Sequence, residues 1–135
     1  MKIIVDSNRV IASLIKDSTT RQILFSSYFE FAAPEFIKEE ILKYEEEIKK
    51  KANISSEEFD LLITLFLERV TLVPLQGYTS LVDRLKKEIS EMKDIPYIAC
   101  CIATNAAGIW SHDFHLKEQT KIKIFTNKDM LEITE

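Results

Sequence analysis

Four acidic residues stand where an α/β protein builds an active site. Asp6 ends the first apolar run of the chain, and Asp113 closely follows a later one, Ile109–Trp110. Asp94 opens the segment that leads into that later run, and Glu40 lies well inside the segment after the second run. Because the carboxyl ends of parallel strands open on one edge of a sheet, we expect these side chains to converge at that edge.

Converging carboxylates repel one another unless a positive charge lies between them. A hard divalent cation meets this need, since Mg²⁺ takes oxygen ligands and is usually held by a few carboxylates, waters and substrate phosphates. Such a site can activate water and neutralise the charge that develops on a phosphodiester. The four acids therefore predict metal-assisted phosphodiester chemistry.

Each acid also has a structural explanation. Asp6 and Asp94 could cap the helices that follow them. Asp113 could be an ordinary turn residue after a strand. Glu40 has acidic neighbours and could lie on a solvated face, and Glu39 competes with it as the acid of this helix. The joint placement of the four acids at one edge carries the inference.

Strands and helices that alternate along the chain must position these acids. Apolar, β-branched runs predict strands over residues 1–6, 29–33, 70–73, 109–111 and 122–126. Helical periodicity predicts helices over residues 8–15, 21–28, 35–51, 55–68, 79–92 and 96–107, and a closing turn or short helix over 128–133. This alternation predicts an α/β fold with a mostly parallel sheet. We find no repeat or boundary, so residues 1–135 are expected to form a single domain.

The composition agrees with one globular domain, but the net charge argues against a nucleic-acid substrate. Of the 135 residues, 46% are hydrophobic and 30% are charged, which suits a soluble protein with a core. The 18 basic and 22 acidic side chains give a net charge of -4, which argues against gripping nucleic acid by bulk positive charge. Acids that hold a cation, however, make a site attractive to phosphate. We therefore expect nucleic-acid binding to be weak without metal.

No apolar run approaches the length of a membrane span, and Asp6 interrupts the first one. We expect neither a transmembrane helix nor a signal peptide, and no membrane partner. Cys100 and Cys101 are adjacent, which makes a disulfide between them poor. They are interpreted as small buried apolar residues of a reducing compartment, so we expect a cytoplasmic protein.

Four segments resemble, in order, the motif blocks of PIN-domain ribonucleases. The opening Ile3-Ile4-Val5-Asp6-Ser7-Asn8 matches the family's hydrophobic run, Asp, small residue and Asn. Residues 34–41 resemble the second block, with Glu40 as its acid, and residues 94–99 resemble the third, with Asp94. Residues 108–113 match the fourth, in which a strand delivers Asp113. The resemblance covers nearly the whole chain and is strongest to compact prokaryotic and archaeal, VapC-like toxins.

This resemblance implies a three-layer α/β/α fold with a five-stranded, mostly parallel sheet, and metal-dependent cleavage of RNA. Carried over, Mg²⁺ or Mn²⁺ and the attacking water would be arranged by Asp6, Glu40, Asp94 and Asp113. Asn8 would hold Asp6 and the local turn through side-chain hydrogen bonds. The hydroxyl of Ser111 could bond a carboxylate or a metal-bound water.

The resemblance also implies partners: an RNA substrate, a second copy of the chain, and an antitoxin protein that blocks the site with an Arg or Lys. The cations expected to meet RNA phosphates are Arg9, Lys16, Arg21 and Lys117. Glu91 could be a secondary ligand, whereas His112 and His115 are interpreted as surface histidines.

Two other phosphoryl-transfer classes fit poorly. A haloacid dehalogenase phosphatase needs a second acid where this chain has Asn8, and a phospho-receiver needs an acceptor Asp that residues 73–77 lack. The alternative that stays open is a PIN-fold binding or assembly module with little catalysis. It is supported by the lack of an aromatic and basic stripe that would grip single strands.

Overall fold

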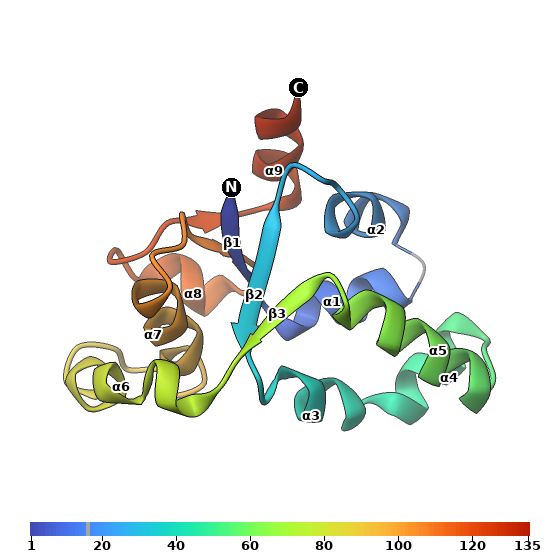
Figure 1. The fold of residues 1–135 in the computed structure, drawn as a ribbon, viewed down its shortest axis with the longest axis horizontal. Coiled ribbons are helices and arrows are strands. Elements are labelled where there is room, and N and C mark those ends of the chain that lie inside the picture. The colour runs from blue at the N-terminus through green and yellow to red at the C-terminus, as the bar shows by residue number, and fades with distance from the viewer. Residues whose placement is uncertain (16) are drawn as a thin grey trace.

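The computed structural model describes residues 1–15 and 17–135, so the predicted RNA contact Lys16 lies outside the described residues. A five-stranded sheet runs through the molecule with every pair of strands parallel (Figure 1). Its strands are β1 (Lys2–Val5), β2 (Glu30–Pro34), β3 (Val70–Val73), β4 (Ile109–Trp110) and β5 (Ile124–Phe125). The predicted α/β class and parallel sheet are confirmed.

The strand order β3-β2-β1-β4-β5 places β1 at the centre. From β1 the chain moves outward through β2 to β3, and then returns to the other side of β1 to form β4 and β5. The order therefore reverses between β1 and β4, whose register pairs Ile4 with Ile109 and Val5 with Trp110. Open parallel sheets bind ligands at such a reversal, beyond the carboxyl ends of the strands.

Alternate residues of the strands point into two separate cores. Ile3 and Val5 face one core, while Ile4 faces the other. The first core is covered by α1 (Ser7–Leu14), α2 (Ser18–Leu24), α3 (Ile37–Leu42), α4 (Glu45–Ala52), α5 (Ser56–Leu67) and α9 (Asn127–Thr134). The second is covered by α6 (Thr79–Lys86), α7 (Ile95–Ala103) and α8 (Phe114–Glu118), and the short η1 (Leu75–Gly77) leads into α6 without burying a residue. The result is the expected three-layer α/β/α arrangement, with α6, α7 and α8 left of the sheet in Figure 1 and α1 to α5 right of it.

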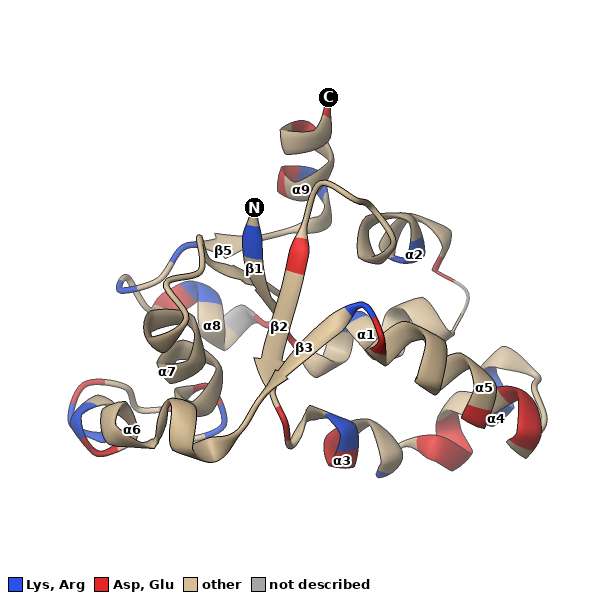
Figure 2. Cartoon of the chain, in the orientation of Figure 1, with Lys and Arg blue, Asp and Glu red and all other residues tan. Residues whose placement is uncertain are grey.

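The single helix predicted over residues 35–51 is wrong, because the structure has two helices there, separated near Tyr44. The order of charges explains the second one. Residues 45–47 are acidic and 49–51 basic, so a helix that begins at Glu45 places each sign at the favourable end of its dipole. The opposite charges gather on this helix (Figure 2), and ion pairs join them: Lys49 with Glu45 and Glu46, and Lys51 with Glu47.

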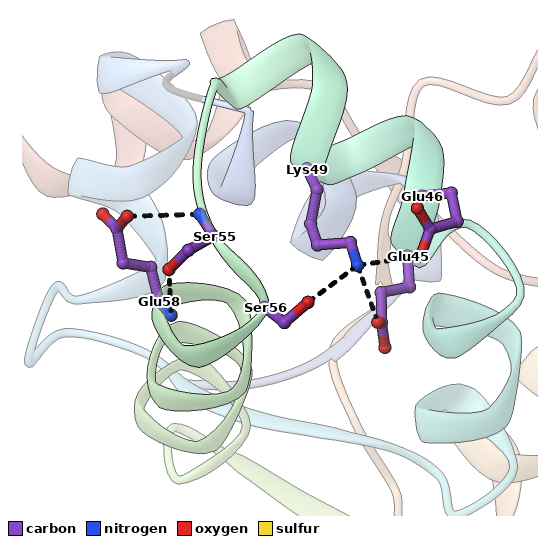
Figure 3. A network of polar contacts seen from close by, with 6 residues as sticks. All are labelled: Glu45, Glu46, Lys49, Ser55, Ser56 and Glu58. Atoms are coloured by element: carbon purple, nitrogen blue, oxygen red, sulfur yellow. Dashed lines mark hydrogen bonds and ion pairs between the residues drawn. The ribbon is translucent and has the colours of Figure 1, made fainter.

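Polar contacts join α4 to α5 (Figure 3). The ammonium of Lys49 pairs with Glu45 at 3.2 Å and Glu46 at 2.8 Å, and donates to Ser56 Oγ at 3.0 Å. Ser55 and Glu58 form a capping box that starts α5, with hydrogen bonds of 3.1 and 3.2 Å. The short turn between the two helices is therefore held from both sides.

Other helix boundaries differ from the prediction where a cap intervenes. α2 begins at Ser18 rather than residue 21, because Asp17 accepts the Thr20 N–H at 3.1 Å. α6 ends at Lys86 instead of residue 92. α8 was not predicted and begins where Asp113 accepts the His115 N–H at 2.8 Å.

α7 ends at Ala103 rather than residue 107, because Asn105 adopts a left-handed φ of 55°. This helix carries no charged residue (Figure 2). It buries Cys100 and Cys101 as free thiols, as predicted. Gly108 follows, where a Cβ would lie 2.4 Å from the carbonyl oxygen of Lys123. A glycine is therefore required for β5 to approach β4 this closely.

Candidate active site

A cleft of about 180 Å³ opens at the carboxyl ends of β1 and β4, at the reversal of strand order. Its lining brings together all four acids selected from the sequence. The lining residues are Asp6, Ser7, Asn8, Glu40, Tyr44, Lys93, Asp94, Tyr97, Asp113 and Leu116. They come from four separated segments of the chain, so the cleft is a product of the fold and not of one local motif.

Asp6 is buried at the junction of β1 and α1, and both of its carboxylate oxygens are engaged. Oδ1 caps α1 by accepting the Asn8 backbone N–H at 3.3 Å, and Oδ2 accepts the Ser111 hydroxyl at 2.6 Å. Burial raises the pKa of Asp6, while the hydrogen bonds from Ser111 and Asn8 act in the opposite direction. Asp6 is thus both the predicted helix cap and a member of the cleft.

Asn8 holds Asp6 through its backbone, where the expectation was a side-chain hydrogen bond. The cap geometry explains the difference, because the second residue of the helix directs its N–H at the capping carboxylate. The exposed carboxamide of Asn8 is left at the rim of the cleft.

Ser111 connects two acids from the end of β4. Its buried hydroxyl donates to Asp6 and accepts the backbone N–H of Asp113 at 2.9 Å. Asp113 in turn caps α8. The hydroxyl of Ser111 therefore bonds a carboxylate, which is one of the two roles expected for it. Through these two hydrogen bonds, Ser111 also sets the spacing between β1 and the segment that carries Asp113.

Asp94 is buried at the start of α7 but makes no side-chain capping hydrogen bond. Pro96 follows two positions later and has no N–H to donate, which removes one of the usual capping partners. Burial, reinforced by the negative charges of Asp113, Glu91 and Asp6, raises the pKa of Asp94 to about 6. The site therefore concentrates negative charge around this carboxyl.

Glu40 of α3 reaches the cleft and is held there by Tyr97 of α7. The Tyr97 hydroxyl donates to Glu40 Oε1 at 2.6 Å, and its ring packs edge-on against Phe36 with centroids 5.7 Å apart. Burial raises the pKa of Glu40, and the hydrogen bond from Tyr97 lowers it. Glu39 lines a different hollow, beside Leu72 and Leu75, so it is Glu40 that faces the other acids.

Tyr97 and Lys93 line the cleft and were missed from the sequence. Tyr97 lies three residues after Asp94, a spacing that places two side chains on one face of a helix. That spacing could have indicated it. Lys93 directly precedes Asp94 and supplies a positive charge that acts on Glu40.

Three basic residues predicted to contact RNA, Arg9, Arg21 and Lys117, are not among the residues that line the cleft. Arg9 is half-buried, its charge acts on Asp6, and its Nε finds no hydrogen-bond acceptor in the described part of the chain. Arg21 is used structurally: its Nε donates to Ser13 O at 2.9 Å and its guanidinium lies over the Phe66 ring. Lys117 is exposed on α8.

The two histidines differ in role. His112 Nε2 accepts the Asn127 backbone N–H at 3.0 Å and so ties the end of β4 to the start of α9. Burial is the main reason that the pKa of His112 lies below its ordinary value. His115 is exposed and lies 3.9 Å from Glu118, as expected for a surface residue.

Within residues 1–15 and 17–135, no three His, Cys, Asp or Glu side chains lie close enough to form a complete metal cage. Mg²⁺ does not require one, since it keeps several waters and is usually bound by one or two carboxylates and substrate phosphates. The hard oxygen donors of the cleft and the raised pKa of Asp94 fit such a cation, which would relieve the repulsion between the carboxylates.

A parallel sheet with helices on both sides and an acidic cleft at its strand-order reversal defines an α/β domain with its site where such folds bind ligands. The model of the PIN domain family matches residues 4–128, and the chain therefore belongs to this family. PIN domains are generally nucleases, which supports a hydrolase. No curated protein matches the chain. In the described residues, no helix has the length and apolar character needed to cross a membrane.

Proposed function

We propose that this protein is a metal-dependent endoribonuclease that hydrolyses RNA phosphodiester bonds. The observation that carries the proposal is the convergence of Asp6, Glu40, Asp94 and Asp113 on one cleft at the reversal of strand order. Carboxylates gathered around a raised-pKa member are typical of sites that bind a hard cation and a phosphate.

Mg²⁺ or Mn²⁺ would be held by Asp6, Glu40, Asp94 and Asp113, one or two of them directly and the others through bound waters. When bound, such a cation would polarise the scissile phosphate and offset its negative charge. Ser111 orients Asp6 for this task, because its hydroxyl fixes one carboxylate oxygen. The ammonium of Lys93 adds a positive charge for the phosphate to approach.

Glu40 is the group that we propose takes the proton from the attacking water. Burial raises its pKa, which makes this carboxylate a stronger base than an exposed one. The hydroxyl of Tyr97 occupies Oε1 at 2.6 Å and so leaves Oε2 as the oxygen to accept the proton. Tyr97 acts here as a positioning residue.

The test is cleavage of RNA in Mg²⁺ or Mn²⁺ against EDTA, with Asp6→Asn and Asp94→Asn as the variants. Asp83→Asn is the matched control, since that side chain is almost fully exposed on α6. We expect cleavage by the wild type and the control, and loss of activity with EDTA and in both site variants. Equal cleavage by all proteins would identify a contaminant and overturn the proposal.

A second candidate is a PIN-fold module that binds RNA or protein with little catalysis. It is favoured by the absence of a three-ligand metal cage from the described residues. This candidate would be supported if the protein cleaves no RNA in the presence of Mg²⁺ or Mn²⁺ and if neither metal raises its melting temperature.

A role as the toxin of a toxin–antitoxin pair is proposed on the same site, because four carboxylates would attract an Arg or Lys of an inhibitory protein. The second proposed partner is another copy of the chain. Exposed Leu42, Leu72 and Leu75 line a hollow of about 610 Å³ next to edge strand β3, where a homodimer would bury apolar surface. The free thiols of Cys100 and Cys101 suit the reducing cytoplasm, which we propose as the location.

A further inference from the structure

A second hollow, of about 230 Å³, adjoins the catalytic cleft. Its lining is mostly apolar, with one aromatic ring and one amide: Asn8, Ile11, Ile15, Tyr44, Glu47, Ile48 and Lys51. Asn8 and Tyr44 also line the cleft, so the two spaces share a wall. A molecule that reaches the four acids can therefore extend into this hollow.

Tyr44 has no evident structural task. It lies between α3 and α4 with 49% of its surface exposed, and in the described part of the chain its phenol makes no hydrogen bond or ring contact. Leaving an aromatic ring in water at the mouth of a cleft forgoes the free energy of burial. The ring is thus available to stack on a ligand.

The remaining lining supplies complementary chemistry. Ile11 and Ile15 provide a partly exposed apolar surface above the buried Ile48, while the exposed carboxamide of Asn8 can both donate and accept hydrogen bonds. At the rim, the Lys51 ammonium pairs with Glu47 at 2.8 Å. An apolar hollow with an aromatic ring and a hydrogen-bonding edge is suited to a nucleobase, which has two flat faces and a polar edge.

We propose that this hollow is a nucleobase subsite, in which Tyr44 stacks on an unpaired base next to the scissile phosphate and Asn8 hydrogen-bonds its edge. The inference rests on the proposed function and deepens it, because it assigns the hollow beside the four acids to one unpaired base of the substrate. A paired base stays in its stack and cannot enter the hollow without unpairing. Stacking on an aromatic ring also tolerates different bases.

The hollow on the other side of the cleft is unsuited to this task. It has a volume of about 460 Å³ and shares Asp94 with the cleft. Its lining includes Glu91 and Glu118, whose charges repel a phosphate backbone, and Glu88, which pairs with Lys121. The substrate strand is therefore held mainly on the Tyr44 side.

The first test measures cleavage of a short single-stranded oligoadenylate by Tyr44→Ala and Tyr44→Phe. We expect Tyr44→Ala to raise KM about tenfold with kcat nearly unchanged, the effect of losing one base–aromatic stacking contact. Tyr44→Phe keeps the ring and should retain the wild-type KM. Tyr28→Ala is the matched control, because Tyr28 is similarly exposed, at 51%, but lies just before the amino end of β2, whereas the cleft opens at the carboxyl ends of β1 and β4. A Tyr44→Ala enzyme that matches this control would overturn the subsite.

The second test does not depend on catalysis. The chain has one tryptophan, Trp110, which is fully buried, so Tyr44→Trp adds an exposed fluorophore over a constant background. We expect adenosine monophosphate to quench the added fluorescence, and ribose phosphate not to. Quenching without any RNA cleavage would support the subsite and count against the nuclease. Cleavage with no quenching and an unchanged KM would overturn the subsite alone, and would leave the hollow to a protein side chain.

Discussion

The hydroxyl of Ser111 donates a 2.6 Å hydrogen bond to Oδ2 of Asp6, a residue 105 positions earlier in the chain. This contact joins the carboxyl ends of β1 and β4, and the same oxygen of Ser111 accepts the N–H of Asp113. One small side chain thereby fixes the distance between two of the acids, at the point where the strand order reverses.

We predict that Ser111→Ala lowers the free energy of unfolding by about 1–3 kcal/mol, because it leaves a buried carboxylate oxygen of Asp6 without its donor. The measurement is urea denaturation, together with the rate of RNA cleavage, which should also fall. Ser80→Ala, at an exposed position in α6, should change neither. A Ser111→Ala protein with wild-type stability and rate would show that this contact positions nothing.

Asp94 predicts how stability depends on pH in the absence of divalent cations. Its folded pKa of about 6 lies above the ordinary value of 3.8, so the folded state binds this proton more tightly than the unfolded state. The contribution of this carboxyl to stability is therefore full below pH 3.8 and is lost as pH rises through about 6. The pKa values of Asp6 and Glu40 are raised as well, which adds to the decline.

Asp94→Asn should weaken that decline and raise the melting temperature at pH 8 in EDTA, measured by thermal denaturation from pH 4 to pH 8. Mg²⁺ should stabilise the wild type at pH 8 and stabilise the variant less. Asp83→Asn, whose side chain is exposed, should follow the wild type throughout. A variant that is less stable than wild type in EDTA would contradict the repulsion inferred around Asp94.

Tyr97→Phe should shift the pH–rate profile while leaving the fold intact. The hydroxyl lowers the pKa of Glu40, so its removal should raise that pKa and move the acidic limb of the cleavage profile to higher pH. We expect kcat to fall more than KM changes. Tyr78→Phe is the matched control, since Tyr78 is equally buried but lies outside the cleft lining. An unshifted limb would remove Tyr97 from the proposed mechanism.

The proposed homodimer predicts that Leu72→Asp yields a monomer. The substitution places a charge in the apolar hollow beside β3, which a second copy would have to bury without a partner. Sedimentation equilibrium gives the mass directly. Leu61→Asp alters a more exposed leucine of α5 and should leave the dimer intact. A wild type that is monomeric at high concentration would dismiss the proposal.

The positions of the acids were predictable because strand ends leave a local trace: an apolar run followed at once or shortly by an acid, as at Asp6 and Asp113. The parallel sheet was predictable because apolar, β-branched runs alternate along the chain with segments of helical periodicity. Helical periodicity alone predicts one helix over residues 35–51, whereas the order of charges, acidic at 45–47 and basic at 49–51, indicates a separate helix that begins at Glu45.

Other features could not be obtained from the sequence, because they depend on packing between distant elements. The bond from Tyr97 to Glu40 requires α3 and α7 to meet, which Phe36 achieves by packing on the Tyr97 ring. The bond between His112 and Asn127 requires β4 and α9 to lie together. The raised pKa of Asp94 arises from charges that gather only in the folded chain.

The strand order has a consequence for synthesis. β1 is made first, yet its central place leaves Asp6 without Ser111 and Asp113 until β4 has emerged from the ribosome. A nascent chain that ends anywhere before residue 111 can pair β1 with β2 but has no closed acidic cleft. The cleavage activity proposed for this cleft therefore requires β4 to dock beside β1, because only then do Ser111 and Asp113 join Asp6.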